Sequence, residues 1–186
     1  MKLRLLTVIG VILAAAPLRI GAQPASATIV GDLLHDWSNM KATIADIGEA
    51  MPEDKFGFKP APTQRTFGEQ LLHIAHGNVL GLKPLGANST PPDIDLKATS
   101  KAAIMKAVAD SFDYGTAVIK AQTEQSITLV IQGPPVPELG DPARRPYGMV
   151  TRAKLVWATI GHAWDEYGAM TTYLRLNDIV PPASRK

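Results

Sequence analysis

One predicted helix, residues 157–176 (WATIGHAWDEYGAMTTYLRL), places two ionisable side chains where a core-facing stripe is expected. At 100° per residue, a single stripe runs through Leu155, Ala158, His162, Glu166, Ala169 and Tyr173. Burying polar groups costs free energy unless partners satisfy them. His162 and Glu166 therefore require a hydrogen-bond network, a catalytic role as a pair, or a metal ion, with a partner supplied by another part of the chain.

Apolar residues at steps of three and four predict four amphipathic helices, at about residues 28–51, 66–82, 100–122 and 151–177. Thr66 and Glu69 form a capping-box pattern at the start of the second helix. Ser100 and Thr151 are suited to cap the third and the last. Four such helices predict an all-α fold, a helical bundle that forms one domain.

The connections between these helices are long and rich in proline. Residues 86–99 are long enough to be a crossover and not a tight turn. Residues 133–148 hold five prolines, which predict a surface loop near the mouth of the fold. Residues 127–131 are rich in β-branched side chains, but no partner strand is evident, so we expect them to be loop.

The first 27 residues have the pattern of a secretory signal. Lys2 and Arg4 precede an apolar run at 5–18, and small residues follow at 21–22 and 25–27. We expect residues 1–27 to be removed and residues 28–186 to form the exported domain, periplasmic or extracellular. The alternative is an uncleaved membrane anchor, although the run is shorter than the ~20 residues of a spanning helix. No stable membrane span is expected after cleavage.

Composition narrows the chemistry. The formal net charge is +2 and no dense basic run precedes the last two residues, so we expect no binding to nucleic acid. Cysteine is absent, which leaves His, Asp and Glu as ligands for any metal site. Of the four histidines, His35 lies one turn before Asn39, beside the apolar stripe of the first helix. A half-buried, hydrogen-bonded histidine is expected there.

The other three histidines lie in the second and last helices. His162 and Glu166, four residues apart, can reach one ion or one substrate proton from the same helix face. A plain helix-stabilising pair has the same spacing. Glu69 and His73 are also four apart, and His76 follows after three residues. They lie on the less apolar side of their helix, so periodicity alone indicates a solvated flank.

Two segments can be compared with known families: MPEDKFGFKPAPTQRTFGEQLLHIAHGN at 51–78 and HAWDEYGAMTTYLRLNDIVPPAS at 162–184. Together they resemble the DinB/YfiT-like family, in its exported bacterial branch. The resemblance implies a four-helix bundle of up-down-down-up topology, in which three residues, usually histidines, bind a divalent metal inside the bundle. The long connection at 86–99 suits this topology, because parallel neighbouring helices need a crossover.

The resemblance places the three metal ligands on His73, His162 and Glu166. The family's commoner pattern has histidine where this chain has Glu166. A carboxylate still suits zinc, nickel, iron or manganese, and it shifts the preference toward harder metals. Glu69 could accept the proton of the outer ring nitrogen of His73, in competition with its capping role. A metal-free polar pocket is the alternative.

The last helix has a second apolar stripe, made of Trp157, Ile160, Trp164, Tyr167 and Thr171. Burial under the proline-rich loop would explain it. A homodimer that packs through these tryptophans is the other explanation, and the one we expect.

Three functions compete. The first is an exported metal-binding bundle without catalysis, with a possible small-molecule ligand; no general base beyond the ligands is identifiable. The alternative is a metal-dependent enzyme, a thiol transferase or a hydrolase that uses a metal-activated thiol or water. Export favours the hydrolase with metal-activated water over the thiol transferase, because the thiols such transferases use are mostly cytosolic. A third, structural interpretation has His162 and Glu166 hydrogen-bonded to each other or to Tyr173, and predicts that Glu166→Gln is nearly neutral.

Overall fold

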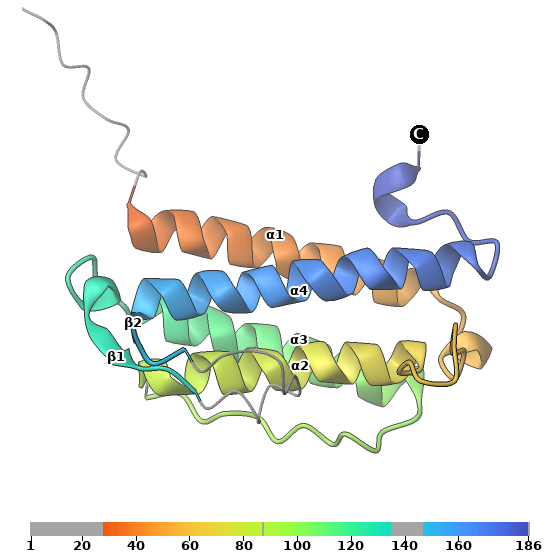
Figure 1. Cartoon of the computed structure of the whole chain (residues 1–186), viewed down its shortest axis with the longest axis horizontal. Helices are drawn as coiled ribbons and strands as arrows, with labels where there is room; N and C mark the ends of the chain where they lie inside the picture. The colour runs from red at the N-terminus through yellow and green to blue at the C-terminus, as the bar shows by residue number, and fades with distance from the viewer. Residues whose placement is uncertain (1–27, 87, 135–146, 186) are drawn as a thin grey trace, which may run out of the picture.

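The computed structural model describes residues 28–86, 88–134 and 147–185. Four long helices form a bundle: α1 (Ile29–Ala50), α2 (Phe67–Leu82), α3 (Lys101–Lys120) and α4 (Arg152–Arg175) (Figure 1). Short 3-10 helices lie between and after them: η1 (Glu53–Lys55), η2 (Lys83–Leu85), η3 (Ser126–Thr128) and η5 (Pro182–Ser184). The predicted all-α four-helix architecture is confirmed.

Side-chain caps define where the helices begin. The Thr66 hydroxyl accepts the Glu69 amide at 3.1 Å, and the Glu69 carboxylate accepts the Thr66 amide at 2.6 Å, which completes the predicted capping box of α2. The hydroxyls of Ser100 and Thr151 cap α3 and α4 by accepting the amides of Ala103 and Lys154. Each cap satisfies an amide that the first helical turn leaves without a partner.

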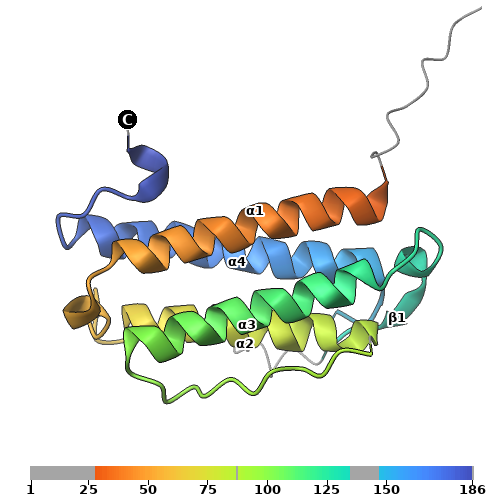
Figure 2. The ribbon, with the colours of Figure 1, turned by 180° about the vertical axis from the view of Figure 1, so that it is seen from behind.

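The topology is up-down-down-up. Helices α2 and α3 run in the same direction, and the connection between η2 and α3 returns along the length of the bundle, as both views show (Figures 1 and 2). Helix α4 runs parallel to α1 and antiparallel to α2. Helices α2 and α4 are in contact, so a residue of one can meet a residue of the other in the bundle interior.

The prediction that residues 127–131 form only loop is wrong. Strand β1 (Val130–Gln132) pairs antiparallel with β2 (Met149–Thr151), with Ile131 opposite Val150. The partner strand lies beyond the proline-rich stretch and runs directly into α4, so the sequence gives it no boundary separate from the helix start. Most of the predicted proline-rich loop, residues 135–146, lies outside the described residues, as does the predicted signal at 1–27.

The core contains large apolar side chains from all four helices. Among those fully buried are Trp37, Met40, Phe67, Leu71, Phe112, Val156 and Leu174. The buried face of α4 lies between the two stripes expected from the sequence: Ile160 is buried, whereas Trp157 is 59% and Trp164 49% exposed. In the stripe expected to face the core, the end residues Leu155 and Tyr173 are buried, the middle ones are half-buried, and Ala169 is exposed. That stripe therefore lies at the border of the core and not at its centre.

Of the helices in the described part of the chain, none combines the length and the hydropathy needed to cross a bilayer.

Candidate metal centre

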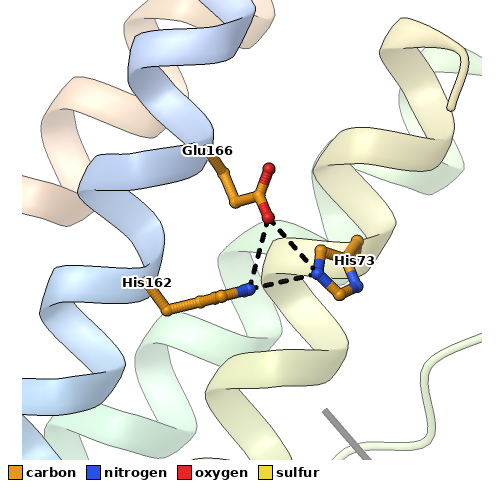
Figure 3. A group of neighbouring side chains, drawn as sticks. All are labelled: His73, His162 and Glu166. Carbon is orange, nitrogen blue, oxygen red and sulfur yellow. Dashed lines mark hydrogen bonds and ion pairs between the residues drawn. The ribbon is translucent and has the colours of Figure 1, made fainter. Parts of the chain in front are cut away.

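Three side chains that were expected to share a site do meet inside the bundle. His73 extends from α2, and His162 and Glu166 extend from successive turns of α4 (Figure 3). The two histidine Nε2 atoms are 3.1 Å apart. Glu166 Oε1 lies 3.4 Å from the Nε2 of His73 and 3.5 Å from that of His162. We call these three atoms the donor triangle. The side chains that carry them point toward the space between them (Figure 3).

A glycine in α2 makes room for this arrangement. A Cβ built at Gly77 would lie 2.9 Å from Cε1 of the His162 ring, too close for an unshifted neighbour. Glycine in a helix interior is destabilising by roughly 0.5–1 kcal/mol relative to alanine. At Gly77 the missing side chain lets the imidazole of His162 reach across the contact to His73. One turn further along, Gly81 faces Thr159 closely in the same way.

The donor triangle is shielded from solvent without being sealed. The side chains of His73, His162 and Glu166 are 16%, 13% and 13% exposed. Burial raises the pKa of Glu166, but the hydrogen bond with His73 and the positive charges that His162 and His73 can carry outweigh it. The net result is a pKa below the ordinary glutamate value, which keeps the carboxylate ionised.

The spacing of the donor triangle fits a divalent ion. Ligand atoms about 2.0–2.2 Å from an ion lie about 3.3–3.6 Å apart in a tetrahedral site and about 2.8–3.1 Å apart in an octahedral one. The three separations, 3.1, 3.4 and 3.5 Å, lie across these ranges. Two histidines and a carboxylate on one side of an ion form a recognised set that leaves further positions for water or substrate. The group could therefore hold a metal ion.

Comparison with solved structures agrees with this fold. The crystal structure of a DinB-like protein from Bacillus cereus superposes with a TM-score of 0.65, over 84% of this chain and 97% of that one. The chain has a DinB-like fold. Sequence identity to that protein is 17%, so the likeness extends to the fold alone. No family model matches the sequence, and no curated protein shows a significant match.

Within this DinB-like fold, Glu69 does not act as the outer partner of His73. Its carboxylate accepts the Thr66 amide, and among the described residues it makes no hydrogen bond to His73. Of the two roles that the sequence allowed for Glu69, the structure therefore shows the capping role. That hydrogen bond is also the largest cause of a lowered pKa at Glu69, ahead of the opposing effect of its slight burial.

The hydroxyl of Tyr173 is also engaged elsewhere. It donates a 2.8 Å hydrogen bond to the carbonyl oxygen of Arg65, and Gln64 Oε1 lies 3.2 Å away. The structural interpretation had His162 and Glu166 bonded to each other or to Tyr173; they lie 3.5 Å from each other, whereas the described hydrogen bonds of the Tyr173 hydroxyl go to residues 64 and 65. Its role is to fasten the segment before α2 to α4.

The remaining histidines lie outside the triangle. His76 lines the hollow beside His73. The side chain of His35 is 74% exposed, with the Asn39 amide 3.3 Å from its Nδ1. The predicted contact with Asn39 is present, but the expected half-burial is wrong, because His35 is directed away from the core on the outer side of α1.

Two open hollows border the donor triangle. One is lined by His73 together with Lys59, Arg65, Glu69 and Leu96, among others. The other is lined by Glu166 with Gln70 and Ala169. Both include residues 63–65. No role for Gly77 or Arg65 was predicted from the sequence. A glycine inside an otherwise apolar helix was the available signal for the first, whereas nothing local marked the second.

Proposed function

We propose that this protein binds one divalent metal ion through His73, His162 and Glu166. The single observation that supports the proposal is the donor triangle, in which three ligand atoms from two helices lie 3.1–3.5 Å from one another. A purely structural pair needs only two of these side chains and no third one aimed at the same point. With one carboxylate, the site suits zinc, nickel, iron or manganese.

A second candidate function is a metal-dependent enzyme. The observation in its favour is that His73 lines one open hollow and Glu166 the other, so that a small molecule could bind next to the ligand residues. A bound divalent metal supplies Lewis acidity, which lowers the pKa of water or of a thiol. The chain itself would contribute binding and orientation. Glu69, the nearest further carboxylate of the His73 hollow, is committed to its capping box.

Metal analysis tests the proposal. Untagged wild-type protein, His162→Ala and the control His35→Ala are compared by elemental analysis after incubation with metal and removal of the excess. We expect close to one equivalent in the wild type and in the control, and a small fraction of it in His162→Ala. Equal, negligible metal in all three would sink the proposal.

The enzyme candidate needs its own assay. Metal-loaded wild type is tested against panels of esters and of thiols with electrophiles. Turnover that His162→Ala abolishes and His35→Ala retains supports the enzyme. If the protein binds stoichiometric metal but turns over none of these substrates, the result supports metal binding without catalysis.

We further propose that residues 1–27 are a secretory signal and that residues 28–186 work outside the cytosol as one exported domain. The support is the basic start, the apolar run and the small residues that follow it. Cell fractionation with N-terminal sequencing tests this: a mature start near residue 23 or 28 is expected, and an intact Met1 in the cytosol contradicts it.

We also propose a homodimer that packs through α4. Trp157 and Trp164 are 59% and 49% exposed and lie about two turns apart on one face of this helix. An apolar patch of this kind, as opposed to a single exposed residue, marks an interaction surface. Light scattering at micromolar concentration is expected to give twice the monomer mass. Trp164→Ser is expected to weaken the association, and a wild-type monomer contradicts the proposal.

A further inference from the structure

We propose that the hollows beside the donor triangle bind an anionic group, a carboxylate or a phosphate, of a small ligand, and that Arg65 is the residue that selects it. The other end of the ligand would lie at the donor triangle. This second part rests on the proposed metal site, whereas the anion site itself does not.

The position of Arg65 supports the inference. The hollow beside His73 and the hollow beside Glu166 share Thr63, Gln64 and Arg65, so this segment lines both hollows. A ligand in either hollow would therefore lie beside Arg65. The hollows measure about 430 and 540 Å³. They suit a small molecule, since ligand sites commonly measure about 300–1,000 Å³.

The backbone at this position is held firmly. The Arg65 carbonyl accepts the hydroxyl of Tyr173 from α4 at 2.8 Å, and the next residue, Thr66, caps α2. The segment is thus fastened both to the helix of His73 and to the helix of Glu166. The base of the arginine side chain therefore keeps a defined place relative to the donor triangle.

The carboxylates and the cations that line the hollows differ in their hydrogen bonds and ion pairs. Both carboxylates have partners: Glu69 accepts the Thr66 amide, and Glu166 faces the two histidines. The Arg65 guanidinium and the Lys59 ammonium make no ion pair or hydrogen bond within residues 28–86, 88–134 and 147–185; they attract Glu69, and Arg65 attracts Glu166, only at longer range. Arginine presents a planar fork that matches carboxylate and phosphate oxygens. Two such cations beside an open hollow favour an anionic guest.

Anion binding can be measured directly by amide chemical shifts. Labelled wild type, Arg65→Gln and the control Arg175→Gln are titrated with succinate, 3-phosphonopropionate and uncharged succinamide, each with and without one equivalent of zinc. Arg175 is exposed in the last turn of α4. Its substitution removes the same positive charge as Arg65→Gln but outside the hollows. We expect shifts at residues 63–73 and a Kd about tenfold weaker in Arg65→Gln alone, as for loss of a charge-assisted hydrogen bond.

The outcomes separate the two proposals. Arg65-dependent binding that zinc tightens supports a ligand that spans both sites, and binding that zinc leaves unchanged supports the anion site alone. Succinate and 3-phosphonopropionate share one carboxylate, so their Kd values show whether a second carboxylate or a phosphonate binds better. Arg65-dependent binding in protein that takes up no zinc supports the anion site while the metal proposal fails. Equal Kd values in all three proteins, equal affinity for succinamide, or shifts away from residues 63–73 overturn the inference.

Discussion

Two antiparallel helix pairs in this bundle use the same steric device for different ends. In the α1–α3 pair, Gly115 faces the indole of Trp37, and in the α2–α4 pair, Gly77 faces the imidazole of His162. In both, a side chain on the glycine would collide with the opposing ring. The missing Cβ is therefore what lets a ring cross between the helices.

The rings differ in where their polar atoms find partners. Trp37 is fully buried, its ring centroid lies 4.8 Å from that of Phe112 with the rings tilted by 48°, and its indole N–H donates to the Phe112 carbonyl at 3.0 Å. His162 instead directs Nε2 at the same point as Nε2 of His73 and the Glu166 carboxylate. At most one proton can lie between the two nitrogens. The first pair completes a core, and the second concentrates acceptor atoms that suit a cation.

The largest expected effect is on the α1–α3 pair. Trp37→Ala removes a fully buried indole and should lower the free energy of unfolding by about 3–5 kcal/mol. Urea denaturation measures this. Zinc bound per folded molecule should stay at the wild-type value, because no atom of the donor triangle comes from α1 or α3. Loss of zinc from the folded fraction would show that the two pairs are not independent.

A methyl group added to the α2–α4 pair tests whether the missing Cβ at Gly77 is needed for metal binding. Gly77→Ala puts a Cβ 2.9 Å from the His162 ring, and overpacking of this kind costs about 1–3 kcal/mol. We expect lower stability together with weaker zinc binding, measured by denaturation and calorimetry. The matched control is Gly161→Ala, where a Cβ meets nothing within 4 Å. It should stabilise α4 by about 0.5–1 kcal/mol and leave zinc binding intact.

A smaller effect is expected from the charge of Glu166 in metal-free protein. Burial raises the pKa of Glu166, but the hydrogen bond and the positive charges of the two histidines lower it by more, so the pKa falls on folding. A lowered pKa adds stability that is present above the unfolded-state value, about 4.3, and is lost as the pH falls through the folded-state value. The stability difference between wild type and Glu166→Gln should therefore shrink in acid. Denaturation at pH 3–7 measures it.

Zinc binding by the same variant discriminates between a metal ligand and a structural pair. A neutral amide is a poorer ligand than a carboxylate, so Glu166→Gln should bind zinc more weakly than wild type in calorimetry. Unchanged zinc content would favour the structural interpretation.

The smallest effect is expected at Tyr173. Tyr173→Phe removes the hydroxyl that bonds to the Arg65 carbonyl and should cost about 0.5–1.5 kcal/mol, the usual range for one hydrogen bond. Zinc affinity should not change, whereas the Kd for succinate should rise because the segment carrying Arg65 is less firmly held. An unchanged Kd would show that Arg65 is positioned by other contacts.

Much of the fold could be predicted because it depends on local rules. Helix periodicity and the caps at Thr66, Ser100 and Thr151 placed the four helices close to their observed bounds. The strand pair was missed, since pairing of Val130 with Thr151 joins residues on either side of a proline-rich stretch. Its formation depends on where the chain returns in space, which no window of neighbouring residues contains.

For the candidate site, the sequence by itself determined that His162 and Glu166 share a face of one helix, because four residues make about one turn. It could not decide that His73 faces them. Periodicity indicated a solvated flank for His73, and only a family resemblance linked it to the pair. The tertiary structure decided this, through a close approach of α2 and α4 that Gly77 permits. It also decided the place of Arg65, since a loop residue takes its position from the elements that hold its backbone.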